Sequence, residues 1–391
     1  FESDLEIPPQ DVEFFAERIW QIATSCQDRR LEEYEKIGWW DYLEGSKRSK
    51  QYQSLLVKGM TRSLVASKAE LASTRTVGTI FFQLILDILE PGVSSDRVLN
   101  GPTSDAWLNP WLNYLQTSGV DYHLNSQVVS INCDASGRIL GVTINDLDNQ
   151  EAEYTVTGDY YVSALPIEIL SGLLTDEMLN ADPRLANVQR LSLSTAWMNG
   201  IQFFLTENPP INHGHILHVD SPWALTSISQ KQFWQSFDFS DYGDGKVKGV
   251  LSVCISDWGF YVDPNTQLAG ITNGSEGEIV KKRANKCTPE EIRDEVWHQL
   301  KQSLNVDGKV ILRDDDRHDW FLDSDIETPN QQNFEAYLKA ALSKPLRQLF
   351  ICIMTLEEEK GYATLDEIAA AMEQRDRDTV KLRTQIDQLV G

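Results

Sequence analysis

Basic side chains are scarce in this sequence, and cysteine is scarcer still. Only 35 lysines and arginines stand against 59 acidic residues, which gives a formal net charge of −24 over 391 residues. This charge excludes a chain-wide nucleic-acid-binding surface, because phosphate is repelled by such a field. The 5 cysteines are too few and too scattered to form a disulfide scaffold.

Long apolar runs are also missing. The longest run, from Val77 to Leu89, contains Gln83 and Asp87 and is shorter than the about 20 residues that a membrane-spanning helix needs. Basic residues between Lys47 and Arg62 leave two interpretations open, a peripheral contact with an anionic membrane surface or solvated helix faces.

No signal peptide is visible at the start of the sequence. It opens on Phe1, so we expect a natural start upstream, and acidic residues such as Glu2 and Asp4 stand where a basic segment would be. We therefore expect a cytoplasmic protein with reduced cysteines. Association with a membrane surface stays open beside this expectation.

Aromatic residues are abundant, with 11 Trp, 12 Tyr and 14 Phe. Disorder of the whole chain is excluded by this content, and the length predicts two or three domains with real cores.

The apolar patterns change along the chain. Helical periods fill about the first hundred residues, as in the run from Val12 to Ile22. Short β-branched and aromatic runs follow, at Gln127–Ile131, Ile139–Ile144 and Ala152–Val156, and they predict an antiparallel meander. The run Tyr160–Ala164 predicts a buried strand that ends this meander.

Further along, strand patterns cover 195–205, 216–219 and 249–256. Thr288, Pro289 and Glu291 predict a helix that begins with a capping box. Helical patterns alone follow from residue 331. The sequence therefore predicts an α+β fold with an all-helical tail.

The segment from Gly101 to Pro166 resembles flavoproteins of the amine-oxidase superfamily, in particular their phytoene-desaturase-like branch. The residues that match the pattern of this branch are spread over the whole segment and keep its order: Gly101, Pro110, Leu115, Gly119, Val120, Val128, Ile131, Asp159 and Val162 to Pro166. Weaker matches extend the resemblance from the N-terminus to about Asn330.

The resemblance implies an FAD-dependent oxidoreductase that acts on an apolar, isoprenoid- or carotenoid-like substrate. It places the backbone of Val128 against adenine, and Ser163, Ala164 and Pro166 beside the flavin. No constellation of His, Cys and carboxylate residues demands acid–base chemistry, so the sequence names no catalytic residue.

Tryptophans offer a candidate pocket for the substrate. Trp107, Trp111 and Trp223 could line a site for a long apolar molecule, with core packing as the alternative.

The resemblance also assigns four regions. Residues 1–100 form a helical substrate-type region, 101–170 part of an FAD-binding-type domain, 171–330 a substrate domain of sheet and helices, and 331–391 a helical module unrelated to the flavoprotein part.

Both ends of the expected flavin site are missing from the sequence. Such flavoproteins open with a strand, a G-x-G-x-x-G turn and a helix that faces the cofactor pyrophosphate. The nearest glycine spacing here, Gly243, Gly245 and Gly249, lies in a charged stretch. We therefore expect the sequence to be an interior part of a longer flavoprotein. This part is expected to be inactive as given, because the segments that would bind the flavin are missing from it.

Two alternatives stay open beside the enzyme. One is a non-catalytic binding protein or fragment. The other gives the tail at 331–391 a helix-turn-helix-like role toward a protein or DNA partner, since Arg375, Arg377, Lys381 and Arg383 lie near its last helix.

Three histidines, His213, His215 and His218, invite a metal. On a strand, however, His218 would point away from the other two, and no cysteine stands beside them at ligand spacing. We therefore predict no metal site.

Overall fold

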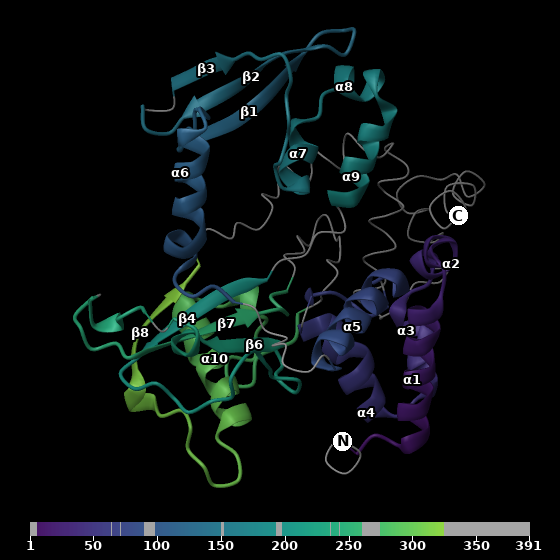
Figure 1. The fold of residues 1–391 in the computed structure, drawn as a ribbon, viewed down its shortest axis with the longest axis vertical. Helices are drawn as coiled ribbons and strands as arrows, with labels where there is room; N and C mark the ends of the chain where they lie inside the picture. The colour runs from purple at the N-terminus through teal and green to yellow at the C-terminus, as the bar shows by residue number, and fades with distance from the viewer. Residues whose placement is uncertain are drawn as a thin grey trace, which may run out of the picture. The chain divides into compact units, whose positions relative to one another are not determined.

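The computed structural model describes residues 6–63, 65–70, 72–89, 98–149, 152–192, 198–234, 236–241, 243–259 and 274–323. These residues form two compact units, and Figure 1 labels most of their α-helices and strands. Unit 1 contains the described residues of 6–114, 198–259 and 274–323, and unit 2 contains those of 115–192. Helices and antiparallel sheets together confirm the α+β class.

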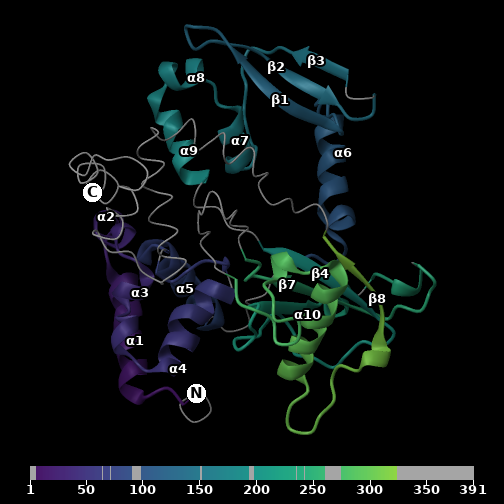
Figure 2. The same ribbon diagram turned by 180° about the vertical axis from the view of Figure 1, so that it is seen from behind.

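The N-terminal part of unit 1 is a group of helices around an aromatic core. The first helix begins at Pro9, since proline is well tolerated in the first turn of a helix. Phe15, Ile19 and Ile22 lie at helical spacing on its buried face. Phe15 makes edge-to-face contacts with Trp39 and with other rings of the core. Figure 2 shows the main helices α1, α3, α4 and α5 side by side.

The elements of this helical part follow closely on one another. They are α1 (Pro9–Thr24), α2 (Gln27–Glu32), η1 (Tyr34–Lys36), α3 (Trp39–Tyr42), η2 (Gly45–Lys47), α4 (Lys50–Tyr52), the π-helical η3 (Gln53–Ser63) and α5 (Thr74–Leu89).

The second part of unit 1 is a five-stranded antiparallel sheet in the order β5-β6-β7-β4-β8. Its strands are β4 (Asn199–Leu205), β5 (Ile216–Leu217), β6 (Leu225–Ser229), β7 (Gly249–Ile255) and β8 (Arg317–Leu322). Short 3-10 turns connect them: η6 (Gln230–Gln232), η7 (Phe239–Asp241), η8 (Ala284–Lys286) and η9 (Asp314–Asp316). β4, β5 and β7 confirm predicted strands, whereas β6 and β8 were not predicted.

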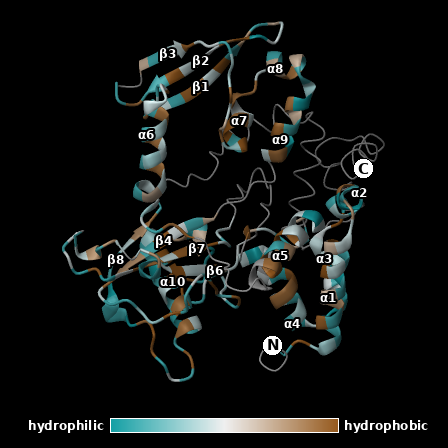
Figure 3. Cartoon of the chain, in the orientation of Figure 1, coloured by the Kyte–Doolittle hydropathy of each residue, from teal (hydrophilic) through white to brown (hydrophobic). Residues whose placement is uncertain are grey.

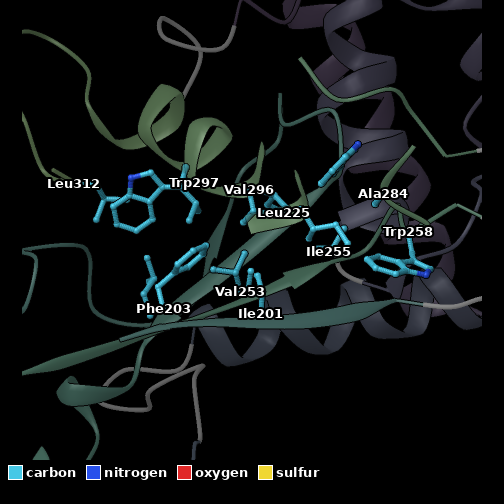
Figure 4. Close-up of a cluster of buried hydrophobic side chains, with 14 of the residues drawn as sticks. Ile201, Phe203, Leu225, Val253, Ile255, Trp258, Ala284, Val296, Trp297 and Leu312 are labelled. Atoms are coloured by element: carbon cyan, nitrogen blue, oxygen red, sulfur yellow. The ribbon is translucent and has the colours of Figure 1, made fainter. Parts of the chain in front are cut away.

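Helix α10 (Pro289–Leu304) covers one face of this sheet. Its N-terminus has the predicted capping box between Thr288 and Glu291, which confirms that prediction. Figure 4 shows Val296 and Trp297 of α10 facing Phe203, Val253 and neighbouring apolar side chains of the sheet. Every second side chain of these strands packs against α10. The side chains between them therefore lie on the opposite face of the sheet.

Unit 2 contains the predicted meander. Strands β1 (Ser126–Cys133), β2 (Ile139–Asp146) and β3 (Ala152–Val156) pair antiparallel in sequence order, with Val128 opposite Ile144. Figure 3 shows apolar and polar residues alternating along β1 and β2. The helices of unit 2 are α7 (Ile167–Leu173), α8 (Asp176–Ala181), η5 (Pro183–Leu185) and α9 (Ala186–Ser192). Before the meander, η4 (Ser104–Leu108) belongs to unit 1, and α6 (Asn109–Thr117) passes from unit 1 into unit 2 after residue 114.

The prediction of a buried strand at Tyr160–Ala164 is wrong for the structure. These residues form no strand, and the side chains of Tyr160 and Val162 are each 92% exposed. An isolated β-rich run cannot form a strand unless neighbouring strands accept its backbone hydrogen bonds, and none of the described strands lies beside it. Pro166 nevertheless precedes a helix as expected, as the N-cap of α7.

The helices predicted in the tail at 331–391 lie outside the described residues. Within the described part, no helix is long and apolar enough to cross a membrane.

A fully buried carboxylate fixes α10 to the loop in front of it. Glu295 accepts hydrogen bonds from the backbone N–H groups of Glu278, Ile279 and Val280 at 2.6, 2.8 and 3.0 Å, and from Gln299 Nε2 at 2.7 Å. Burial by itself raises the pKa of Glu295, but these hydrogen bonds to the charged form outweigh it and the pKa is lowered. The charge is therefore kept inside the protein.

We predict that Glu295→Gln lowers the free energy of unfolding by about 2–4 kcal/mol, because the amide NH₂ would face backbone donors that lose their acceptor. Urea unfolding at pH 7 measures this change. Glu290→Gln, an exposed substitution on the same helix, is the control and should cost less than about 0.5 kcal/mol. Equal effects of the two substitutions would contradict the role given to Glu295.

Candidate functional site

A cavity of about 310 Å³ lies at the face of the five-stranded sheet that α10 leaves uncovered. The paired strands bring its floor together in two rows across the sheet. In one row Gly200 lies opposite Cys254, which lies opposite Thr226, and in the other Gln202 lies opposite Ser252 and Phe321. His215 and Asp323 complete the polar lining.

Polar groups on this floor are held by further contacts. Ser252 Oγ accepts a hydrogen bond of 3.0 Å from Gln230 Nε2. The backbone around Asp323 is tied to β4, since Asn199 Nδ2 donates to the Asp323 carbonyl at 3.1 Å and the Asp323 N–H donates to the Gly200 carbonyl at 3.1 Å. Among the described lining residues there is no Lys or Arg, and Asp323 is the acidic one.

Cys254 is not built as a nucleophile. Burial raises the pKa of its thiol to about 11, although a hydrogen bond with Ser256 lowers it somewhat. A thiol with this pKa stays protonated near neutral pH, so it contributes shape and a weak donor to the cavity floor.

The back of the same sheet contains a buried neutral histidine. His218 contacts Ser303 Oγ through Nδ1 at 2.7 Å and Ser227 Oγ through Nε2 at 2.8 Å, so it joins the sheet side of the core to α10. Burial lowers the pKa of His218 to about 4. The ring therefore remains uncharged over the physiological range.

An ion pair joins the helical part of unit 1 to the loops at the end of the sheet. Arg62, on the π-helical segment, contacts Asp257 Oδ2 with Nη2 at 2.5 Å and with Nε at 3.1 Å. The same guanidinium donates to the carbonyls of Ser221 and Pro222 and to Ser275 Oγ. Asp257 is 4% exposed, so Arg62 supplies a positive charge beside a buried carboxylate. Sequence patterns gave no sign of this pair, because its members are distant in the chain.

The flavin-side residues named from the sequence all lie in unit 2. Val128 is half-buried in β1, which has an unpaired outer edge among the described strands. Ser163, Ala164 and Pro166 are exposed, and none of the four lines the cavity on the five-stranded sheet. Their contact with a flavin therefore stays a prediction.

The three tryptophans do not gather in one pocket. Trp223 is fully buried in the core of unit 1, where its Nε1 donates to the Ser275 carbonyl at 3.1 Å. Trp107 and Trp111 stack on each other at 6.3 Å between ring centroids, about half exposed, on η4 and α6. For Trp223 the structure favours the packing alternative.

The three histidines do not lie together in one site either. His213 packs on Phe233, His215 lines the cavity and His218 is buried. No group of three or more metal-ligating side chains occurs in the described ranges.

The residues that sequence reasoning missed are Gln202, Ser252 and Asp323, since only strand register reveals that they share one face.

The described residues do not form a cradle for a flavin. Gly243 and Gly245 adopt positive φ in a loop that enters β7, and no helix follows them whose N-terminus could face a pyrophosphate. The residues expected beside the flavin stand in an exposed stretch. No chemical step through a flavin is derived from this geometry.

His218 predicts an acid-sensitive fold. Its pKa of about 4 in the folded state lies below the unfolded value of about 6.5, so the unfolded chain takes up the proton first as the pH falls. This contribution to stability is complete above about pH 6.5 and is lost between pH 6.5 and 4. Between pH 7 and 5 the wild type should lose about 2 kcal/mol more than His218→Gln, measured by urea unfolding. The exposed His213→Gln control should follow the wild type, and parallel curves for all three proteins would refute the prediction.

Removing the Arg62 charge should leave the buried Asp257 carboxylate without its positively charged partner. We predict that Arg62→Met lowers the free energy of unfolding by about 2–4 kcal/mol. This is less than for a fully buried ion pair, because the arginine side chain is 27% exposed and solvent screens its charge. Adding Asp257→Asn should restore part of this loss, since the buried charge is then gone. A double variant that is as unstable as the sum of the two single variants would show that the pair is not coupled.

Comparison with known proteins places the chain. The family model described as flavin containing amine oxidoreductase matches residues 108–352, which is more than half of the chain. No curated protein matches it.

Solved structures of low similarity include an oxidoreductase from Methanosarcina mazei, with 12% identity and a TM-score of 0.45, and putrescine oxidase bound to putrescine, with 10% identity and a TM-score of 0.46. Each comparison covers 81% of this chain and 61% of the other, so the chain spans less than two thirds of the length of these structures. The family match confirms the amine-oxidase superfamily that the sequence indicated: the chain belongs to the flavin-containing amine oxidoreductase family.

Proposed function

We propose that this chain supplies the substrate-binding part of an FAD-dependent oxidoreductase, and that the cavity on the uncovered sheet face holds the substrate. The observation that carries the proposal is the cavity itself, whose floor is built from side chains of four adjacent strands. A sheet positions such side chains more rigidly than loops do, which suits a binding site. Family membership supports a flavin, and the sequence resemblance supports FAD as that flavin.

The size of the cavity favours a small substrate. Its volume of about 310 Å³ lies at the lower end of the range of about 300–1,000 Å³ for small-molecule sites. A polyene of carotenoid length would extend well beyond it. An apolar isoprenoid is therefore our second candidate, and it requires space outside the described residues.

The lining favours a positively charged or hydrogen-bond-donating head group on an apolar body. Asp323 offers a carboxylate, Gln202 and Ser252 offer acceptors, and Ile228 and Phe321 offer apolar surface. The net charge of −24 adds a field that attracts cations. We propose a small amine as the substrate class.

A non-catalytic binding protein is the alternative function. It would use the same cavity without electron transfer, so ligand binding is common to both functions. Flavin-dependent oxidation of a bound amine would then separate them.

Gly200 offers a direct test of the cavity. A Cβ built on this residue meets no atom within 4 Å, so a phenylalanine side chain would enter the cavity without a clash at its base. We predict that hexylamine binds the wild type and that Gly200→Phe weakens binding at least tenfold, about 1.4 kcal/mol, in isothermal titration calorimetry. Hexanoate should bind at least tenfold more weakly than hexylamine, because Asp323 repels it.

Gly172→Phe is the matched control, since Gly172 also has open space around its Cβ position but lies on α7 in unit 2. It should bind hexylamine as the wild type does. Undiminished binding by Gly200→Phe, or tighter binding of hexanoate than of hexylamine, would overturn the proposed site.

A further inference from the structure

A second cavity, of about 470 Å³, lies on the α10 side of the five-stranded sheet. It is larger than the cavity on the uncovered face, and the function proposed above makes no use of it. Its walls come from the start of α10, from the loop after β7 and from β8, the outermost strand in the sheet order. The side chains that dominate the walls are apolar or aromatic: Trp258, Pro289, Ile292, Trp320, Phe321 and Leu322.

Strand register decides which side chains of β8 face which cavity. Trp320 lies opposite Phe203, whose side chain is buried under α10, so Trp320 faces the second cavity. Phe321 lies opposite Gln202 and therefore points toward the uncovered face of the sheet. Neighbouring residues of one edge strand thus contribute an aromatic ring to each side.

The two cavities meet at the end of β8. Phe321 and Asp323 line both of them. Asn199, a buried residue that lines the second cavity, donates from Nδ2 to the Asp323 carbonyl at 3.1 Å, so the backbone at the junction is held in place. A ligand that passes the end of this strand would contact both cavities at once.

The walls of the second cavity suit an uncharged ring. Trp258 and Ile292 are 7% and 3% exposed, and Figure 4 shows Trp258 beside Ile255 of the sheet core. The Arg293 guanidinium lies 5.4 Å from the centroid of the Trp320 ring and covers it. Aromatic side chains that are held in this way offer flat apolar surface against which another ring can pack.

Polar groups are few in this cavity. Burial raises the pKa of the Cys287 thiol to about 11, so it stays neutral near pH 7. Among the described lining residues there is no Lys or Arg, and Asp323 at the junction is the acidic one. The interior of the second cavity therefore favours the apolar end of a ligand, and the junction favours its cationic end.

We propose that the two cavities form one binding site for an arylalkylamine, an amine whose alkyl chain ends in an aromatic ring. The amino group lies on the uncovered sheet face, the chain passes Phe321, and the ring packs against Trp258 and Trp320 in the second cavity. Together the two volumes stay within the range of about 300–1,000 Å³ that small-molecule sites occupy. The inference rests on the proposed function, because that function places the amino group.

Phenylhexylamine, which is hexylamine with a phenyl ring at its far end, tests the proposal on the wild type. It should bind at least tenfold more tightly than hexylamine in isothermal titration calorimetry, because the ring leaves water for an apolar cavity. The indole N–H resonances of Trp258 and Trp320 should shift with phenylhexylamine, and that of Trp234, which lines neither cavity, should not. Equal affinities, or unshifted Trp258 and Trp320 resonances, would overturn the proposal.

Two substitutions change the second cavity from different walls. Trp320→Leu removes an aromatic wall and Cys287→Phe fills the space near the start of α10. Each should lower the ratio of phenylhexylamine to hexylamine affinity at least fivefold. The ratio is the readout because a partly unfolded variant loses both ligands alike. Trp234→Leu, the same change at another half-buried tryptophan of unit 1, should keep the wild-type ratio, and an unchanged ratio in both cavity variants would contradict the proposal.

Gly200→Phe distinguishes one site from two. If the cavities form one site, filling the first should also weaken phenylhexylamine binding at least tenfold. Undiminished binding with a shifted Trp258 resonance would show two independent sites and overturn the proposal. Hexylamine binding that gains nothing from the ring would refute this inference alone, whereas failure of hexylamine to bind would refute the proposed substrate site on which it rests.

Discussion

The packing of α10 against one face of the five-stranded sheet is the constraint on which the rest of unit 1 depends. It removes every second side chain of β4, β6 and β7 from water and so decides which residues remain on the opposite face. Glu295 and Ser303 of the same helix hold the loop at 278–280 and His218 in place by buried hydrogen bonds. Because a buried carboxylate is costly without its donors, these contacts fix the loop at 278–280 against α10. The cavity lies on the face of the sheet that α10 leaves uncovered.

Much of the local structure could be predicted from the sequence. The capping box at Thr288 and the meander of β1, β2 and β3 were recognisable, because both depend on residues close together in the chain. β6 and β8 escaped prediction, since their identity depends on pairing with distant strands. The cavity floor escaped for the same reason, because Gly200, Cys254 and Thr226 become neighbours only through register.

The stretch at 160–165 shows a different limit. Its composition indicated a buried strand, yet burial requires partners that composition cannot provide. The same residues that resemble the flavin side of the family are thus exposed in this chain. The chain belongs to the flavin-containing amine oxidoreductase family, yet its described residues do not form a cradle for a flavin.

Amide chemical-shift mapping with hexylamine tests the central claim, that the uncovered sheet face is the ligand site. The account predicts shifts that saturate with ligand and concentrate at Gly200, Gln202, Thr226, Ser252 and Cys254, with α10 and unit 2 unaffected. Shifts that concentrate on unit 2, or on the aromatic core of the N-terminal helices, would contradict it.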